Sequence, residues 1–337
     1  MATDMQGFVL TRYGDASAME LREVPEPTAG AGEVLVRVRA AGLNPIDYKV
    51  RQGAMRLVQR LDLPQVAGSE LSGEVEAVGA GVTRFAVGDR VFARVDKKKL
   101  GAYAHYAVVD EALVGKMPDS LDFADAAGLP LAGLTALQGL RDELGVTAGD
   151  RVFISGGAGG VGTLAIQLAS WMGAEVATTA SPRGEELVRS LGATTVVDYQ
   201  REKFRDVLRD YDGAFDLTGG DDLRDSFAVL KRGAKTVSVA GLPEPVNARE
   251  DFDSGPLVAA ALWLAGAKVR RQARKQGVGY RFLFMHPSGA DLDLLAGLVD
   301  KGELRPVTDR VFPFARIADA FAYLEQGHAK GKVVVEM

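Results

Sequence analysis

The segment Arg151–Gly162 constrains the fold of this chain more than any other. Four residues with a strand-like pattern, Arg151–Ile154, lead into a glycine cluster, and a helical pattern follows at once. Within the cluster, Gly157, Gly159 and Gly162 have the spacing G-x-G-x-x-G. Glycines at these positions allow a tight turn, close approach of backbone N–H groups to a diphosphate, and close helix–strand packing. The segment therefore predicts a dinucleotide site at a helix N-terminus, where an anion is favoured.

An ordinary strand–turn–helix would also fit this segment, so the neighbouring sequence has to distinguish a cofactor site from an ordinary turn. Helical stretches separate five predicted strands, at Arg151–Ile154, Glu175–Thr179, Thr194–Asp198, Ala214–Thr218 and Ala234–Val239. Alternation with short connections is typical of a parallel, doubly wound sheet. The glycine segment is then the first turn of that series, which favours cofactor binding over an ordinary turn.

Residues 6 to about 115 have a different pattern. Glu33–Arg39 alternates, with Val34, Val36 and Val38 on one face, and further short apolar runs are divided by glycine turns. This pattern predicts a compact, mostly antiparallel β-domain.

The region after the fifth strand contains the longest apolar stretch, Pro256–Ala267, which is too short to span a bilayer and is broken by Gly266. We expect a helix from Pro256 whose basic end, Lys268–Lys275, places cations at the helix C-terminus, where they are favourable. The net charge of −5 gives no overall positive field for nucleic acid or an anionic membrane, so neither partner is expected. The first six residues lack the layout of a secretion signal, and we expect a cytoplasmic protein.

Metal chemistry is disfavoured by composition. The chain has no cysteine, which excludes thiol catalysis, cysteine-ligated zinc and iron–sulfur clusters. Its histidines, His105, His286 and His328, are scattered, and none has a second histidine or a carboxylate three or four residues on. We therefore expect no metal site.

The end of the second strand bears on which dinucleotide binds. NAD-binding sheets commonly carry an acid there, whereas this chain has no acid until Glu185 and offers Ser181 and Arg183. One charge-assisted hydrogen bond contributes about 1.5–3 kcal/mol, a preference of about ten- to hundredfold. Ser181 also suits a helix N-cap with Pro182 at the first position, and a phosphate can sit at such an N-terminus. We expect NADPH rather than NADH.

With these features, the chain resembles the zinc-independent branch of the medium-chain dehydrogenase/reductase family, with the quinone oxidoreductases and alkenal/enone reductases most similar. Zinc members carry a cysteine where this chain has Gly42–Asn44, and Gly-His-Glu where it has Gly68-Ser69-Glu70. The resemblance rests on separated blocks: Ala41–Lys49, Gly68–Gly73, Gly79 with Gly88-Asp89, Ala126–Ala136, the glycine cluster, Val197–Tyr199, Gly302–Pro306 and Gly331–Val335.

This resemblance implies an α/β fold with two domains. A GroES-like, β-rich catalytic domain would comprise residues 1–126 and 288–337, and a doubly wound Rossmann domain that binds NADPH would comprise residues 127–287. The active site would lie in the cleft between the domains. Relatives often form homodimers by pairing a sixth strand edge to edge, and Tyr280–Met285 would be that strand.

The resemblance also implies site residues. Asn44, Tyr48 and Lys49 would line the cleft, with Tyr48 bonding the substrate and Lys49 contacting the cofactor or an oxyanion, whereas Asp47 would order its own loop. Cofactor contacts would come from the glycine turn and from later segments: Thr135, Gly157, Ala158, Gly159, Gly160, Val161, Gly162, Ser181, Arg183, Tyr199, Gly241, Leu242, Phe284, Met285 and Lys332 near the pyrophosphate.

Without a metal, a cysteine or an obvious acid–base pair, the chemistry should be one that a held nicotinamide performs nearly unaided. Hydride transfer from NADPH to a quinone, or to the β-carbon of an α,β-unsaturated carbonyl compound, fits this condition. The protein then has to stabilise negative charge on the substrate oxygen. Two alternatives stay open: a non-catalytic NADPH-binding protein with a sensor or structural role, and an enoyl reductase acting on carrier-linked substrates.

Overall fold

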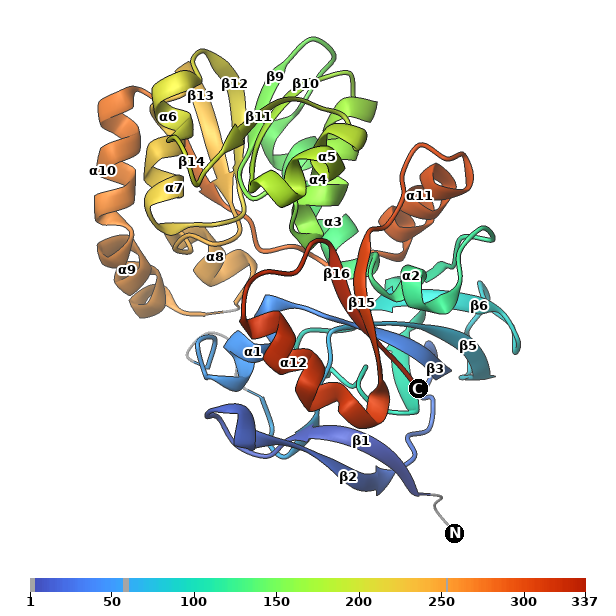
Figure 1. The fold of residues 1–337 in the computed structure, drawn as a ribbon. Helices are drawn as coiled ribbons and strands as arrows, with labels where there is room; N and C mark the ends of the chain where they lie inside the picture. The colour runs from blue at the N-terminus through green and yellow to red at the C-terminus, as the bar shows by residue number, and fades with distance from the viewer. Residues whose placement is uncertain (1–3, 57–60, 253) are drawn as a thin grey trace. The chain divides into compact units, whose positions relative to one another are not determined.

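The computed structural model describes residues 4–56, 61–252 and 254–337. The chain forms two compact units, unit 1 from Met1–Leu134 with His286–Met337 and unit 2 from Thr135–Met285 (Figure 1). Both chain ends belong to unit 1, so unit 2 is an insertion. The predicted domains end at different residues, 126/127 and 287/288, and that division stays a prediction.

Unit 1 is built on a seven-stranded sheet and a three-stranded sheet. The described strand pairs are antiparallel except for β15 with β16, so the predicted, mostly antiparallel β-domain is confirmed. In the larger sheet the order is β15 (Thr308–Pro313), β16 (Lys332–Glu336), β3 (Glu33–Leu43), β5 (Glu70–Val78), β6 (Arg90–Arg94) and β8 (Val114–Lys116), with β7 (Tyr106–Asp110) paired to β3. The smaller sheet has the order β2 (Met19–Pro25), β1 (Asp4–Leu10) and β4 (Gln65–Val66).

The core of unit 1 follows from strand β3. Val34, Val36 and Val38, which were predicted to share one face, are all buried, and they form one apolar cluster with residues of β5, β6 and β7. A second cluster includes Leu43 at the end of β3 and packs helix α12 (Ile317–Glu325) against the strands. The remaining helices are α1 (Pro45–Arg51), α2 (Phe123–Ala127), α3 (Pro130–Gln138), which runs on into unit 2, and α11 (Gly289–Asp300), with short 3-10 turns η1 (Ala16–Ala18), η2 (Glu111–Leu113) and η4 (Phe314–Arg316).

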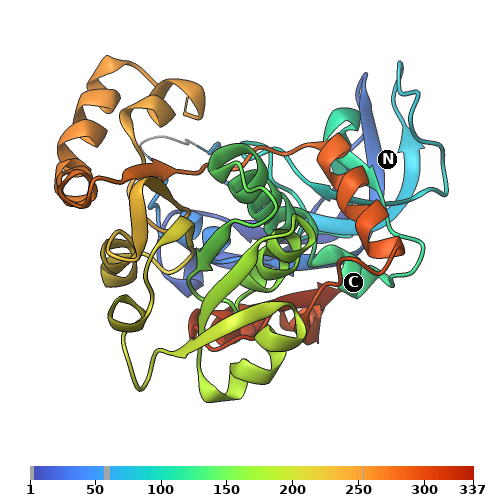
Figure 2. The same cartoon turned by 90° about the horizontal axis from the view of Figure 1, so that it is seen from above.

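Unit 2 is a six-stranded parallel sheet flanked by helices (Figure 2). The strand order reverses next to β9, which is the switch point at which doubly wound sheets bind ligands. The predicted doubly wound sheet is thus confirmed, with the glycine segment directly after β9. The order is β11 (Ala193–Asp198), β10 (Glu175–Ala180), β9 (Arg151–Ile154), β12 (Tyr211–Asp216), β13 (Leu230–Ser238) and β14 (Gly279–Phe282).

The helices of unit 2 cover both faces of this sheet. They are α4 (Gly160–Trp171), α5 (Pro182–Ser190), α6 (Phe204–Val207), α7 (Gly220–Ser226), α8 (Pro245–Glu250), α9 (Pro256–Ala265) and α10 (Ala267–Gln276), with a π-helical turn, η3 (Gly139–Leu144), after α3.

The predicted helix from Pro256 is wrong in one respect. The chain forms two helices that meet at Gly266, and α10 begins at Ala267. Lys268 therefore lies in the first turn of a helix, and only Arg274 and Lys275 of the basic stretch occupy a last turn. The predicted strand Tyr280–Met285 is also shorter, because β14 ends at Phe282 and leaves Phe284 and Met285 beyond it.

Candidate functional site

The glycine turn of unit 2 is tied to the end of strand β10. The N–H of Gly157 donates to the carbonyl of Thr179 (3.1 Å), and the N–H of Gly156 donates to the Thr179 hydroxyl (2.9 Å). A Cβ on Gly157 would lie 2.1 Å from Thr178 Oγ1, and one on Gly162 would lie 2.4 Å from the Gly156 carbonyl. Packing within the turn therefore requires glycine at positions 157 and 162.

Gly159 is a glycine for a different reason. A Cβ there would meet only the Gly156 carbonyl at 3.4 Å, so the protein itself leaves room for a side chain. Gly159 is the N-cap of α4, whose first-turn N–H groups, including those of Gly160 and Val161, have no partner within the helix. These donors suit an anion, and a bare backbone at Gly159 would let it come close. The arrangement fits a dinucleotide pyrophosphate.

The end of β10 lies beside this turn. Ser181 is the N-cap of α5 with Pro182 at the first position, as predicted, and its hydroxyl makes no capping bond. A Cβ on Gly184 would lie 3.1 Å from Cβ of Ala158, so the first turn of α5 packs closely on the glycine turn. Arg183, in the same turn, is exposed. The predicted 2′-phosphate contacts are thus on a helix N-terminus next to the glycine turn, and their role stays a prediction.

The other predicted cofactor residues follow strand ends of unit 2, except Thr135, which is buried in α3, and Lys332. Tyr199 comes directly after β11 and is 59% exposed. After β13, the N–H of Gly241 donates to Ser238 Oγ (2.8 Å), and the Leu242 carbonyl accepts from the Tyr280 hydroxyl (2.7 Å). Phe284 and Met285 follow β14, with the Phe284 ring 5.1 Å from that of Phe252.

A buried carboxylate that sequence reasoning missed joins three strand ends. Asp216, the last residue of β12, accepts from Ser155 Oγ (3.1 Å), from Ser238 Oγ (2.6 Å) and from the N–H of Gly219 (2.9 Å). Ser155 follows β9 and Ser238 ends β13. Asp216 therefore fixes the carboxyl edge of the sheet at the switch point. The strand predicted at Ala214–Thr218 placed this residue inside an element, so no sequence signal marked it as a strand end.

In unit 1, the loop after β3 carries the predicted catalytic residues. Asn44 is the N-cap of α1, Pro45 is its first residue, and the carboxylate of Asp47 accepts the N–H of Asn44 (2.9 Å). This capping arrangement explains why the chain turns into a helix at the end of a long strand. Asp47 orders its own loop, as predicted.

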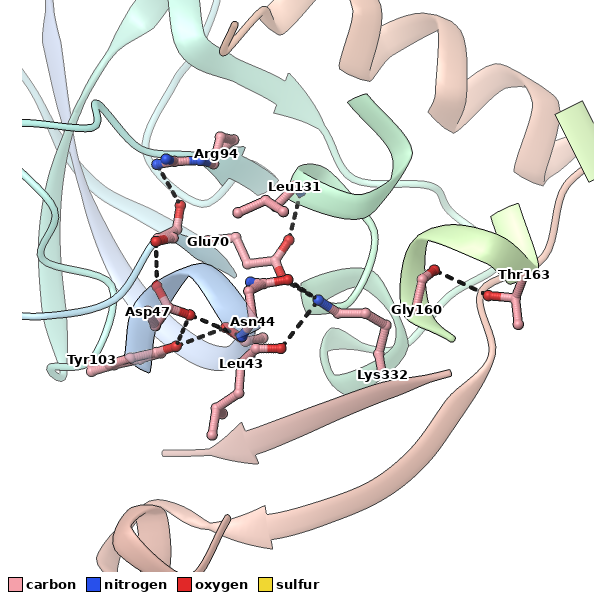
Figure 3. A network of polar contacts seen from close by, with 12 residues as sticks. Leu43, Asn44, Asp47, Glu70, Arg94, Tyr103, Leu131, Gly160, Thr163 and Lys332 are labelled. Atoms are coloured by element: carbon pink, nitrogen blue, oxygen red, sulfur yellow. Dashed lines mark hydrogen bonds and ion pairs between the residues drawn. The ribbon is translucent and has the colours of Figure 1, made fainter. Parts of the chain in front are cut away.

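Asn44 also belongs to a buried group of charges (Figure 3). Its Nδ2 donates to Glu70 Oε1 (2.7 Å), and its Oδ1 accepts from the Lys332 ammonium. Lys332 Nζ lies 2.7 Å from Glu70 Oε1 and 3.3 Å from the carbonyl of Leu43. The other Glu70 oxygen accepts the N–H of Leu131 (2.6 Å), in the first turn of α3. The acidic and basic side chains thus tie β5, β16 and the start of α3 to the Asn44 loop.

These contacts occupy polar atoms of Asn44 and Lys332 that their predicted roles would require. Asn44 is 3% exposed and both ends of its amide are bonded within unit 1. The three donors of the Lys332 ammonium are directed at Leu43, Asn44 and Glu70. A pyrophosphate contact of Lys332 would have to replace one of these bonds, and it remains an untested prediction.

A second buried group surrounds the carboxylate of Asp47. It accepts hydrogen bonds from the Ser69 hydroxyl and from the Tyr103 hydroxyl (2.7 Å), and Tyr103 also donates to the Gly42 carbonyl (3.1 Å). Burial raises the pKa of Asp47, and burial beside this carboxylate raises the pKa of Tyr103 well above its ordinary value. Burial lowers the pKa of the neighbouring Arg94, which donates to the Ser69 carbonyl (3.2 Å). Sequence reasoning missed Tyr103, Glu70 and Arg94 as parts of the site.

Tyr48 and Lys49 lie on helix α1. Tyr48 is half-buried against the core cluster that includes Leu43, and this burial, with a smaller contribution from the carboxylate of Glu325, raises its pKa. The phenol therefore stays protonated and can donate a hydrogen bond at neutral pH. Lys49 is exposed.

The residues at the zinc positions of related enzymes do not fit a zinc ion. By the resemblance, these positions lie within Gly42–Asn44 and at Gly68-Ser69-Glu70, where Asn44 and Ser69 use their side chains as hydrogen-bond donors, to Glu70 and Asp47. Glu70, the remaining carboxylate, is paired with the Lys332 ammonium, whose charge would repel a cation. Within residues 4–56, 61–252 and 254–337, no three His, Asp or Glu side chains are grouped so as to hold a metal.

Two family models match the chain. The alcohol dehydrogenase GroES-like domain matches residues 30–119, in unit 1. The zinc-binding dehydrogenase model matches residues 191–335, which include the second half of unit 2 and the C-terminal part of unit 1.

Individual relatives cover almost the whole chain. The NADPH-dependent alkenal/one oxidoreductase of Arabidopsis thaliana chloroplasts is 38% identical over 98% of this chain and 79% of its own length. The mitochondrial NAD(P)H oxidoreductase RTN4IP1 of Danio rerio is 37% identical over 99% of this chain and 92% of its own. The solved quinone oxidoreductase of Coxiella burnetii superposes with a TM-score of 0.85 at 31% identity, covering 99% of this chain and all of that one.

Proposed function

This chain belongs to the medium-chain dehydrogenase/reductase family, and from that premise we propose that it is an NADPH-dependent, metal-free reductase. Its substrate is a quinone or an α,β-unsaturated carbonyl compound. The observation that carries this proposal is the 38% identity, over 98% of the chain, to an NADPH-dependent alkenal/one oxidoreductase. A chloroplast envelope quinone oxidoreductase homolog of the same plant, 32% identical over 96% of the chain, supports the quinone alternative.

The cofactor would be held by unit 2. The N–H groups at the start of α4 receive the pyrophosphate, and Ser181 with Arg183 receives the 2′-phosphate. Thr135 of α3 and residues that follow the strand ends would complete the site: Tyr199, Gly241, Leu242, Phe284 and Met285. When bound, NADPH supplies the hydride, and the protein holds and orients it.

Unit 1 would supply the group that stabilises charge on the substrate. Tyr48 donates a hydrogen bond from its neutral hydroxyl to the substrate oxygen, where negative charge develops. Asn44 acts as a positioning residue, because its amide nitrogen donates to Glu70 and its amide oxygen accepts from Lys332. The Glu70–Lys332 pair keeps the Asn44 loop, and with it helix α1, at a fixed place on the sheet.

A substrate panel tests this function. We expect NADPH to be oxidised with quinones, short enones or 2-alkenals, whereas saturated alcohols with NADP⁺ give no turnover. Binding of one NADPH per chain without turnover of any free substrate would contradict the proposal and favour the non-catalytic alternative. Turnover confined to carrier-linked enoyl substrates would contradict it in favour of an enoyl reductase.

Assembly and location extend the proposal. The short edge strand β14 is available for pairing with the same strand of a second copy, and a homodimer formed in this way is part of the proposed function. No helix among the described residues is long and apolar enough to cross a membrane. A cytoplasmic location remains a prediction, since relatives are named as mitochondrial and chloroplastic proteins.

A further inference from the structure

Helix α9 of unit 2 is apolar and has no buried residue. Leu257, Trp263 and Leu264 on this helix are 86%, 56% and 67% exposed. Helices of globular proteins normally bury an apolar stripe, and a contiguous exposed one marks an interaction surface. Among residues 4–56, 61–252 and 254–337, nothing buries the apolar side chains of α9, so they are free to contact a partner.

The neighbouring helix α10 is basic. Lys268, Arg271, Arg274 and Lys275 are exposed on it, and none of them has an ion-pair partner among the described residues. The sequence contains no Asp or Glu from 254 to 290, although the chain has 45 acidic residues in all. The charge on α10 is thus locally unbalanced in a protein whose net charge is −5.

Helix electrostatics do not explain this cluster. Because α10 begins at Ala267, Lys268 and Arg270 lie in its first turn, next to the positive end of the helix dipole. Cations at that end are unfavourable. The interpretation of the whole stretch as a basic C-terminal end therefore fails, because only Arg274 and Lys275 lie in the last turn of α10.

Arg270 joins the apolar and the basic helix into one surface. Its guanidinium lies 5.8 Å from the centre of the Trp263 ring, and it donates to the Trp263 carbonyl. Figure 1 shows α9 and α10 one after the other at the β14 side of the sheet of unit 2. Exposed Trp and Leu side chains and unpaired cations are thus presented together.

We propose that the α9–α10 surface docks onto an anionic phospholipid membrane. Leu257, Trp263 and Leu264 would enter the headgroup region, and the cations of α10 would contact lipid phosphates. Trp is favoured at this depth because one edge of its ring is polar. From the net charge we expected no membrane partner. That expectation does not hold for this surface, because salt screens charges more than about 10 Å apart, and the cations of α10 therefore determine the electrostatic interaction at contact.

A second copy of the chain fits this surface less well. In a twofold contact made by the α9–α10 surface itself, as distinct from the proposed β14 pairing, each surface meets itself, so two basic α10 helices would approach each other with no acid between 254 and 290 to pair them. An anionic lipid surface complements both the charge and the apolar side chains. If the proposed function holds, docking would also bring the reductase to quinones dissolved in the bilayer. Vesicle binding itself does not depend on that function.

Co-sedimentation of the full chain with vesicles tests the proposal without any substrate. We expect binding to phosphatidylcholine vesicles that contain phosphatidylglycerol, weakening as NaCl is added, and no binding to pure phosphatidylcholine. Arg271→Glu with Lys275→Glu should abolish it. Lys98→Glu with Lys301→Glu changes the net charge equally at exposed sites elsewhere and should leave it unchanged. Absence of binding, or equal losses in both double variants, would overturn the proposal.

The two tryptophans of the chain provide a second measurement. Trp171→Phe leaves Trp263 as the only indole, and its emission should shift to the blue on phosphatidylglycerol vesicles. Trp263→Phe leaves Trp171, at the end of α4, whose emission should not shift. A blue shift of Trp263 that grows with protein concentration in the absence of vesicles would show that a second copy covers α9, and would refute the membrane proposal.

Discussion

Lys332 Nζ lies 2.7 Å from Oε1 of Glu70, and the two side chains are only 4% and 0% exposed. The residues are 262 positions apart, one on the last strand and one on β5. The pair joins two segments of unit 1 that unit 2 separates in the sequence. Lys332 also bonds Asn44, and Glu70 also bonds the first turn of α3.

Removing the ammonium should therefore strongly destabilise the protein. Lys332→Met leaves the Glu70 carboxylate buried without its counter-charge, and we expect a loss of about 3–5 kcal/mol in the free energy of unfolding. Adding Glu70→Gln should recover part of this loss, because the uncompensated charge is then removed. Urea unfolding of the three proteins measures both effects.

The matched control is an exposed pair of similar length. Lys99 Nζ lies 2.6 Å from Glu33 Oε1, but the Lys99 side chain is 65% exposed. Lys99→Met should cost only about 0–1 kcal/mol. Equal, small losses for the two Lys→Met variants would contradict a structural role of the buried pair.

Two glycines of the turn after β9 should respond differently to alanine. In Gly162→Ala the new Cβ would overlap the Gly156 carbonyl at 2.4 Å, so we expect a loss of stability of about 1–3 kcal/mol together with weaker NADPH binding. In Gly159→Ala the nearest atom is 3.4 Å away, so stability should change by less than about 0.5 kcal/mol.

The affinity for NADPH then distinguishes a glycine that the protein needs for its own packing from one that the bound cofactor needs for close approach. Gly159→Ala should raise the Kd for NADPH about tenfold, the equivalent of one charge-assisted hydrogen bond, because the methyl group lies where a phosphate approaches. Thermal unfolding and fluorescence titration with NADPH measure the two quantities. Unchanged affinity in Gly159→Ala would place the pyrophosphate elsewhere.

Arg183 should set the preference for NADPH. Arg183→Ala removes a cation from the first turn of α5, and kcat/KM for NADPH should fall about ten- to hundredfold while that for NADH stays the same. Arg189→Ala, in the last turn of the same helix and paired with Glu185, is the control and should affect neither cofactor. If the wild type used NADH as well as NADPH, the assignment of Ser181 and Arg183 would be wrong.

Tyr48 should act on turnover rather than on cofactor binding. Tyr48→Phe keeps the ring in the core and removes only the hydroxyl, so kcat should fall about a hundredfold with an unchanged Kd for NADPH. Because burial raises the pKa of Tyr48 above its ordinary value of 10.0, the phenol stays neutral and the wild-type rate should show no inflection from it between pH 6 and 9. Unaltered kcat in Tyr48→Phe would remove Tyr48 from the mechanism.

Local patterns in the sequence were sufficient to predict the helices and strands that carry the proposed cofactor residues, whereas the cofactor contacts themselves stay predictions. The glycine spacing, the alternation of strands and helices, and the acid-free end of β10 all lie within short segments, and the structure has each of the elements they predict. The break at Gly266 was harder to predict, because one glycine costs a helix only about 1 kcal/mol and the apolar pattern continues up to it.

The buried charged residues of unit 1 are brought together by contacts between distant segments, which no local sequence pattern predicts. Glu70, Lys332 and Leu131 meet only because β5, β16 and the start of α3 come together in unit 1. Asp216 was hidden for a related reason. A strand predicted at 214–218 placed it inside an element, whereas β12 ends at Asp216 and frees its carboxylate to bond the neighbouring strand ends.

The most direct test of metal-free reduction by NADPH uses one protein preparation. It is dialysed against a strong chelator and analysed for zinc, and NADPH oxidation by a quinone and by a 2-alkenal is measured before and after dialysis. Asn44 and Ser69 serve as hydrogen-bond donors and Glu70 is paired with Lys332, so turnover should be the same before and after dialysis, without stoichiometric zinc. Activity that is lost on dialysis and restored by added zinc would contradict it.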